Sequence, residues 1–75
     1  MDIETAVLLM ARRAGLNARR LSLKMGRAES FISTTFAKGS NPKASTLVDM
    51  ARACDYHLAF VPDEIERPYG SIYID

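Results

Sequence analysis

The sequence predicts a mainly helical domain of four helices, followed by a short C-terminal strand or hairpin. Apolar residues recur at intervals of three and four over most of residues 3–54, and glycines such as Gly15 and Gly26 interrupt this period. Beyond residue 54 the pattern changes to alternation. With 75 residues and no long polar linker, the chain has room for one domain. We therefore expect a single domain at 1–75, divided into a helix bundle at 3–54 and a strand-forming extension at 55–75 that serves as a dimerisation element or a lid.

The first two helices are expected on either side of Gly15. Apolar residues share one face from Ile3 to Ala14, and Gly15 suits the left-handed conformation that ends many helices. Asn17 is a good N-cap for the second helix, and Gly26 allows a sharp turn after it. The side chains of the second helix expected to face inward are those of Ala18, Leu21, Ser22 and Met25. Two leucines of the first helix, Leu8 and Leu9, lie off its apolar face. They indicate a second buried surface, against either the chain's own tail or another subunit.

The third helix, expected from about Ala28 to Ala37, has two very different sides. One side is mostly apolar and is formed by Ala28, Phe31, Ile32, Thr35 and Phe36. The opposite side is small and polar and is formed by Glu29, Ser30, Ser33, Thr34 and Ala37. Short hydroxyl side chains stabilise an exposed helix poorly, but they allow close approach to base edges in a DNA major groove. Two short helices joined by a turn, with this face on the second, have the layout of a helix-turn-helix.

After a loop at Gly39 to Pro42, the sequence predicts a fourth helix and then strands. Leu47, Met50, Ala51 and Cys54 share one face of a helix at 44–54. Residues 56–61 then alternate between apolar and other side chains before Pro62, and residues 71–74 form a second short candidate strand. Two strands alone are marginally stable in water. We expect them to pack on the helices, to pair across a dimer, or both.

The net charge of +1 hides a strong segregation of charge along the chain. The segment 11–43 carries eight basic residues and one acid, Glu29. The basic residues are Arg12, Arg13, Arg19, Arg20, Lys24, Arg27, Lys38 and Lys43. The rest of the chain carries eight acids and two bases. A basic segment suits a polyanion such as DNA, although a solvated surface accounts for the charges equally well.

Other chemistry has little support in the sequence. His57 has no neighbouring ligand at metal-binding spacing, and Cys54, the only cysteine, lies on an apolar helix face. We therefore expect no catalytic residues, no metal and no cofactor, and we do not expect an enzyme. No apolar run reaches the roughly 18 residues of a membrane span, and the chain starts without a basic leader, so a soluble, cytoplasmic protein is expected.

Three runs of residues resemble the Cro and phage-repressor (XRE) helix-turn-helix family. They are Gly-Leu-Asn-Ala-Arg-Arg-Leu-Ser-Leu-Lys-Met-Gly-Arg-Ala-Glu-Ser-Phe-Ile-Ser, Lys-Gly-Ser-Asn-Pro and Thr-Leu-Val-Asp-Met-Ala-Arg-Ala, within residues 7–53. The resemblance implies a four-helix, lambda-repressor-like domain that binds operator DNA as a homodimer and regulates transcription, in the cytoplasm and nucleoid of a prokaryote or a phage. Many antitoxins share this domain and append a strand, so the alternative is an antitoxin that binds a toxin protein as well as its own operator.

The chain departs from the family pattern at four positions. Ala11 and Phe36 stand where the family commonly has an arginine and a glutamate that pair, and an apolar pair can replace a buried ion pair without loss of stability. Ala18 replaces a frequent phosphate-binding glutamine, so Asn17 or Arg19 would have to contact the phosphate. Ala28 replaces a common Ser or Thr cap, which costs about 1 kcal/mol.

Carried over by position, the family pattern assigns two groups of residues. Base reading falls to Glu29, Ser30, Ser33 and Thr34, although Glu29 could equally serve only to offset the helix dipole. Phosphate binding falls to Asn17, Arg19, Lys38, Ser40 and Lys43, with Arg12, Arg13, Arg20 and Lys24 as weaker candidates. From the unplaced apolar residues we expect a dimer interface formed by Leu8, Leu9, Val48, Leu58, Phe60, Ile72 and Ile74.

Overall fold

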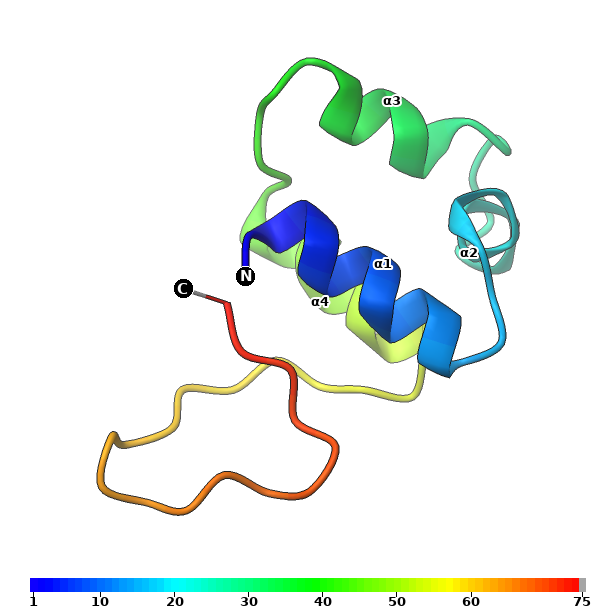
Figure 1. Cartoon of the computed structure of the whole chain (residues 1–75). Coiled ribbons are helices and arrows are strands. Elements are labelled where there is room, and N and C mark those ends of the chain that lie inside the picture. Colours follow the sequence, from blue (N-terminus) through cyan, green and yellow to red (C-terminus); the bar gives the residue numbers. More distant parts are fainter. Residues whose placement is uncertain (75) are drawn as a thin grey trace.

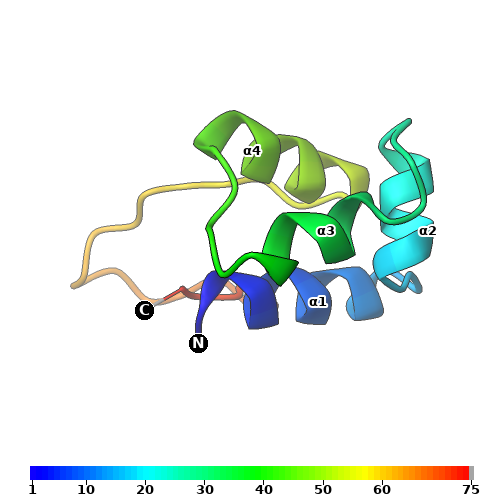
Figure 2. The ribbon, with the colours of Figure 1, turned by 90° about the horizontal axis from the view of Figure 1, so that it is seen from above.

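The computed structural model describes residues 1–74, and this part of the chain contains four helices. They are α1 (Ile3–Arg13), α2 (Ala18–Lys24), α3 (Phe31–Ala37) and α4 (Ala44–Ala53). Helices α1 and α4 lie side by side, α2 lies near one end of this pair, and α3 crosses one side of it (Figures 1 and 2). The prediction of a mainly helical chain with four helices is therefore confirmed.

The ends of the helices follow from local chemistry. Asp2 caps α1 by accepting a hydrogen bond from the Thr5 backbone N–H at 2.8 Å, and Asn17 caps α2 by accepting one from Arg20 N–H at 2.8 Å. Gly15 follows α1 with a φ of 77°, which confirms the predicted left-handed cap, and Gly26 follows α2 with a φ of 75° at the predicted sharp turn. Each gives the chain a sharp change of direction that few other residues adopt.

Helix α4 ends in the same way but with a residue other than glycine. Asp55 has a φ of 60°, and the next residue, Tyr56, donates its backbone N–H to the Ala51 carbonyl at 2.8 Å. Asp55 N–H donates to the Arg52 carbonyl at 3.1 Å, which completes a Schellman motif. Aspartate tolerates the left-handed region better than most residues do. This turn directs the rest of the chain, residues 56–74, back along the helices as a tail.

The core lies where the four helices meet, and every helix contributes to it. Its buried apolar members are Val7, Met10, Ala11, Leu21, Ile32, Phe36, Met50, Ala51 and Cys54. Leu21 and Met50 have no exposed surface. Ala11 and Phe36, which stand where the family pattern has an ion pair, are both in this cluster, so the core is apolar at that point.

The structure corrects the start of the third helix. The sequence predicts a beginning near Ala28, but α3 begins at Phe31. Ala28 has no side-chain oxygen to cap a helix; instead its carbonyl accepts a turn hydrogen bond from Phe31 N–H at 3.0 Å. Ser30 occupies the N-cap position without a side-chain cap hydrogen bond, and its carbonyl accepts the helical hydrogen bond from Thr34 N–H at 2.8 Å.

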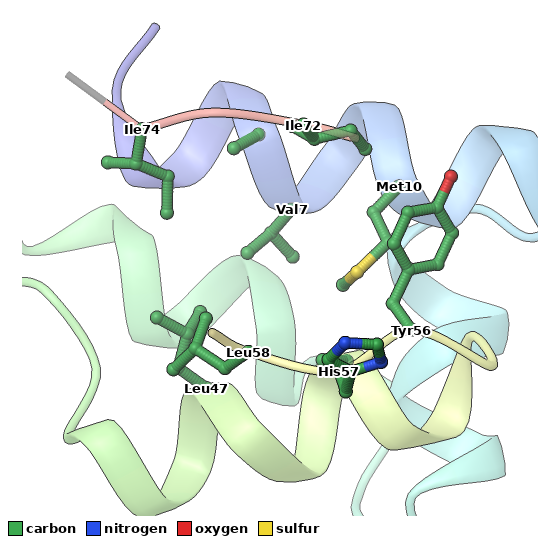
Figure 3. Close-up of a pocket in the computed structure, with 10 residues that line it drawn as sticks. Val7, Met10, Leu47, Tyr56, His57, Leu58, Ile72 and Ile74 are labelled. Atoms are coloured by element: carbon green, nitrogen blue, oxygen red, sulfur yellow. The ribbon is translucent and has the colours of Figure 1, made fainter. Parts of the chain in front are cut away.

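The structure also corrects the predicted C-terminal strand or hairpin. Residues 1–74 contain no strand, although two tail segments, 56–58 and 72–74, run past each other (Figure 3). Each segment lies against a different helix, with Tyr56 and Ile72 packed against the core, and an apolar groove separates them. No backbone hydrogen bond joins residues 56–58 to residues 72–74, in line with the low stability of an isolated two-stranded pair.

The tail covers the side of the α1–α4 pair that faces away from α3 (Figures 1 and 2). Its return is fixed to α1 by the half-buried Ile72 and by a hydrogen bond of 3.2 Å from Arg13 Nη1 to the Gly70 carbonyl. Among the described residues, no helix has the length and apolar character needed to cross a membrane.

Candidate nucleic-acid interface

The turn between α2 and α3 is built by backbone hydrogen bonds around Gly26. Gly26 N–H donates to the Leu23 carbonyl at 3.0 Å, and Arg27 N–H donates to the Ser22 carbonyl at 3.0 Å. These bonds close a Schellman motif at the end of α2. Arg27 then lies over the Phe31 ring, with 4.7 Å between the guanidinium carbon and the ring centroid. The turn is therefore tied to the first residue of α3.

Ser22 is the buried polar link between α2 and α3. Its side chain has no exposed surface. The hydroxyl donates to the Ala18 carbonyl at 2.8 Å and accepts from the Ile32 backbone N–H at 3.0 Å. An N–H in the first turn of a helix has no partner within that helix, so the Ser22 hydroxyl satisfies a donor that would otherwise be buried alone. Ser22 thus fixes the start of α3 relative to α2.

The exposed side of α3 carries short polar side chains. Ser33 and Thr34 lie within α3 and are exposed, whereas Ile32 and Phe36 on the other side are buried. Glu29 and Ser30, which the sequence places on the same helix, lie instead in the turn just before it, and both are exposed. The four predicted base-reading residues therefore remain together at the start of α3, although only two of them are helical. We call this set the α3 polar face.

Glu29 and Arg19 form an ion pair at the edge of the α3 polar face. Arg19 Nε lies 3.0 Å from Glu29 Oε2, and both side chains are 63% exposed. The two terminal nitrogens of Arg19 have no hydrogen-bond partner among the described residues. A carboxylate that holds Nε leaves those nitrogens able to donate to another acceptor. Arg19, a predicted phosphate-binding residue, and Glu29, a predicted base-reading residue, thus bind each other in this structure.

Three of the other predicted phosphate-binding residues follow α3, and the fourth, Asn17, lies at the start of α2. Lys38 is the C-cap of α3, Lys43 is the N-cap of α4, and Ser40 lies in the loop between them, all three exposed. Asn17 is exposed, but its side-chain oxygen already caps α2. Among the weaker candidates, Arg12, Arg20 and Lys24 are exposed, whereas Arg13 is bound to the Gly70 carbonyl of the tail.

The residues predicted for a dimer interface fall into two groups. Leu8, Leu58, Phe60 and Ile74 are exposed, and Leu9, Val48 and Ile72 are half-buried. Ile72 packs against the core, so part of the predicted second surface of α1 is covered by the chain's own tail.

His57 and Cys54 are the two residues that the sequence considers for other chemistry. No group of three or more His, Cys, Asp or Glu residues is placed to hold a metal ion within residues 1–74. His57 is exposed and lies beside an apolar groove. Burial raises the pKa of the Cys54 thiol, and this favours the neutral thiol over the nucleophilic thiolate.

Comparisons of the chain with family models, with curated proteins and with solved structures found no match. The resemblance to the Cro and phage-repressor family therefore stays a prediction that rests on the residues themselves.

Sequence reasoning missed two features of this site. The sequence predicts that Ser22 faces inward, but it does not predict the hydrogen bond that Ser22 accepts from Ile32 N–H. A lone serine among the inward residues of a short helix is the signal that could have revealed this bond. The Arg19–Glu29 pair spans ten residues of sequence across a turn. No helical spacing rule connects such positions, so only the structure identifies the pair.

Proposed function

We propose that the chain is a sequence-specific DNA-binding regulator of transcription, of the Cro and phage-repressor helix-turn-helix type, that binds operator DNA as a homodimer. The observation that carries the proposal is the α3 polar face, where exposed Ser33 and Thr34 share a helix with buried Ile32 and Phe36. Helices that enter a major groove need one side anchored in the domain and small hydrogen-bonding side chains on the other. α3 combines both sides in seven residues.

The charges around α3 support the same proposal. Arg19 lies at one end of the α3 polar face, and Lys38 and Lys43 follow α3 at the other end. Cations on both sides of a reading helix would contact the phosphates that border the groove and set its register. In a homodimer, two such helices would enter successive major grooves about 34 Å apart on an inverted repeat.

A gel-shift assay on genomic fragments, followed by footprinting, tests the proposal. We expect a protected inverted repeat that the protein binds at least about 1,000-fold more tightly than random DNA at physiological salt. Equal binding to selected and random fragments, with no protected repeat, would contradict sequence-specific recognition.

Thr34→Ala and Arg19→Ala should change DNA binding in different ways. Loss of the Thr34 hydroxyl should lower discrimination at one base pair by about 1–3 kcal/mol, because that side chain is assigned to a base edge. Arg19→Ala should weaken binding to all sequences alike and reduce the salt dependence of binding by about one phosphate contact. Titrations against a panel of single-base operator variants at several salt concentrations measure both effects. If Arg19→Ala changed the preferred base and Thr34→Ala did not, the two assignments would be wrong.

Glu29→Gln tests the role of the Arg19–Glu29 pair. The amide keeps an oxygen that can accept from Arg19 Nε but removes the opposing charge, so Arg19 should interact more strongly with a phosphate. We expect the slope of log K against log salt for random DNA to steepen by up to about 0.9. The control is Glu4→Gln, an exposed acid of α1 outside the pair, which should leave the slope unchanged. The pair has no such role if Glu29→Gln steepens the slope equally in the Arg19→Ala background.

An antitoxin is the second candidate, and the exposed apolar side chains of the tail favour it. Leu58, Phe60 and Ile65 are largely exposed although they are large and apolar, which is common at protein-binding surfaces. In this alternative the tail binds a toxin protein while α3 binds the operator. A pull-down from the native host tests this alternative, and recovery of no second protein species would count against it.

A further inference from the structure

A polar recess lies where the ends of α2 and α4 meet the turn at Gly26. It is lined by Lys24, Met25, Arg27, Asp49, Arg52 and Ala53. Three of these side chains are cations, and they come from the last turn of α2, from the turn before α3 and from the last turn of α4. The recess has a volume of about 400 Å³, and small-molecule sites in proteins occupy about 300–1,000 Å³. It is therefore large enough for a small molecule.

Capping of the helix ends does not account for the cations of this recess. Basic side chains are common in the last turn of a helix, where they can bind its final carbonyls. Here the backbone N–H groups of the Schellman motifs at Gly26 and Asp55 already occupy carbonyls at the ends of both helices. Neither Lys24 nor Arg52 forms a side-chain hydrogen bond or an ion pair with any residue in the described part of the chain. Their charges are therefore available to a ligand.

The one acid of the recess, Asp49, is also unpaired. Asp49 and Arg52 are three residues apart on α4, a spacing at which opposite charges commonly pair on a helix. They do not pair in this structure, and Asp49 has no other ion-pair partner within residues 1–74. A carboxylate and three cations thus line the same space without neutralising one another. This combination suits a ligand that has both anionic groups and a hydrogen-bond donor.

Two of the cations are oriented before a ligand arrives. The guanidinium of Arg27 lies over the Phe31 ring, which leaves its N–H groups free at the edge, and no described residue accepts a hydrogen bond from them. Burial raises the pKa of the Cys54 thiol, and the charge of Lys24 opposes this effect, so Lys24 acts on the α4 side of the recess. Side chains that are already oriented lose less entropy when they bind.

We propose that this recess binds a small molecule that carries a diphosphate group and a hydroxyl group, as a nucleoside diphosphate does. The phosphate oxygens accept from Lys24, Arg27 and Arg52, and the hydroxyl donates to Asp49. A single phosphate carries only about −1.5 to −2 charges, so three cations match a diphosphate better. This binding site goes beyond the proposed function and does not depend on DNA binding.

The phosphates of DNA share part of this chemistry, but Asp49 favours a free small molecule. Within a DNA strand the sugar has no 2′-hydroxyl, so the backbone has no donor for a carboxylate. Asp49 would therefore repel a DNA backbone in the recess, whereas it would accept a hydrogen bond from the ribose of a nucleotide.

Isothermal titration calorimetry of the full chain at physiological salt, with pyrophosphate, ADP and adenosine, tests the proposal. We expect ADP and pyrophosphate to bind and adenosine not to bind. Arg52→Gln should weaken the binding of both anions by at least about 10-fold, because it removes one charge-assisted contact. Arg12→Gln is the matched control, since Arg12 is an exposed arginine in the last turn of α1 and lies outside the recess. It should leave both affinities unchanged.

Asp49→Ala tests the hydroxyl contact separately. Pyrophosphate has no sugar hydroxyl, so loss of the carboxylate should only strengthen its binding. ADP should lose a hydrogen bond to a charged acceptor, and the preference for ADP over pyrophosphate should fall by about 10-fold. Asp49 and Arg52 are exposed, so the helical circular dichroism of each variant should equal that of the wild type.

Three outcomes would overturn the proposal. The first is a wild type that binds neither pyrophosphate nor ADP at millimolar concentration. The second is an equal loss of affinity in Arg52→Gln and Arg12→Gln, which would indicate general attraction of anions to a basic surface. The third is an equal gain for both ligands in Asp49→Ala. If a DNA duplex but neither small anion bound, and Arg52→Gln weakened that binding, the recess would be assigned to a DNA phosphate instead.

Discussion

Leu21→Ala is expected to lower the free energy of unfolding by about 2–5 kcal/mol. Leu21 is fully buried where α2 meets the core, so truncation removes apolar contact and leaves a cavity among Val7, Ile32 and Met50. Small domains are stable by only about 5 kcal/mol or slightly more. The variant should therefore retain about 3 kcal/mol or less, and urea denaturation followed by circular dichroism should give a much lower midpoint than for the wild type.

Leu23→Ala provides the matched control for this experiment. Leu23 lies two residues further along α2 but is 48% exposed. The same chemical change there should cost less than about 1 kcal/mol, because the side chain buries little area and leaves no cavity. If the two variants lost equal stability, the orientation of α2 in this fold would be wrong.

Ser22→Ala is expected to have the second-largest effect, about 1–3 kcal/mol of stability. Alanine keeps the side chain at this position small, but it removes the acceptor for the buried Ile32 N–H. The loss should be local to the start of α3, so the Ile32 amide should exchange its hydrogen faster than amides of α1 do. Operator affinity should also fall, even where the variant is fully folded, because the α3 polar face is no longer held in one orientation.

Ser45→Ala is the control for Ser22→Ala. Ser45 is an exposed serine in the first turn of α4, and no hydrogen bond of its side chain to a described residue is present. The control should change stability by no more than about 0.5 kcal/mol. Equal losses for the two serines, or an unchanged Ile32 amide in Ser22→Ala, would contradict the role assigned to the Ser22 hydroxyl.

The sequence predicts the helical part of this fold well because the controlling interactions there are local. Gly15 and Asn17 mark helix ends through conformational freedom and capping within three residues, and the structure confirms both. Apolar spacing likewise identifies Leu21 and Met50 as core residues. The candidate site is also predicted as a group, since Ser33 and Thr34 are exposed on the helix that carries Ile32.

The predictions are wrong where contacts between distant segments, rather than local sequence, determine the structure. The predicted start of α3 is wrong by three residues. The positions of apolar and polar side chains alone do not distinguish a first helical turn from the separate turn at Ala28 that precedes the helix. Alternation of side chains in residues 56–61 predicts a strand. Alternation does not identify a second backbone segment with which that strand would pair. The described chain supplies no such backbone, and Tyr56 and Ile72 pack on helices instead.

The way the tail is attached has a consequence for the lifetime of the protein. Its return contact joins Arg13 to Gly70 across 57 residues, through one exposed hydrogen bond next to the half-buried Ile72. With the helices folded, this contact closes the flexible loop formed by residues 55–70, and two weak contacts offset little of the entropy lost on ordering that loop. The tail should therefore open while the helices remain folded, and a protease that needs an unfolded segment would cut there first. If a second copy covers the tail, cleavage would slow as the protein accumulates, so abundance itself would set the rate of turnover.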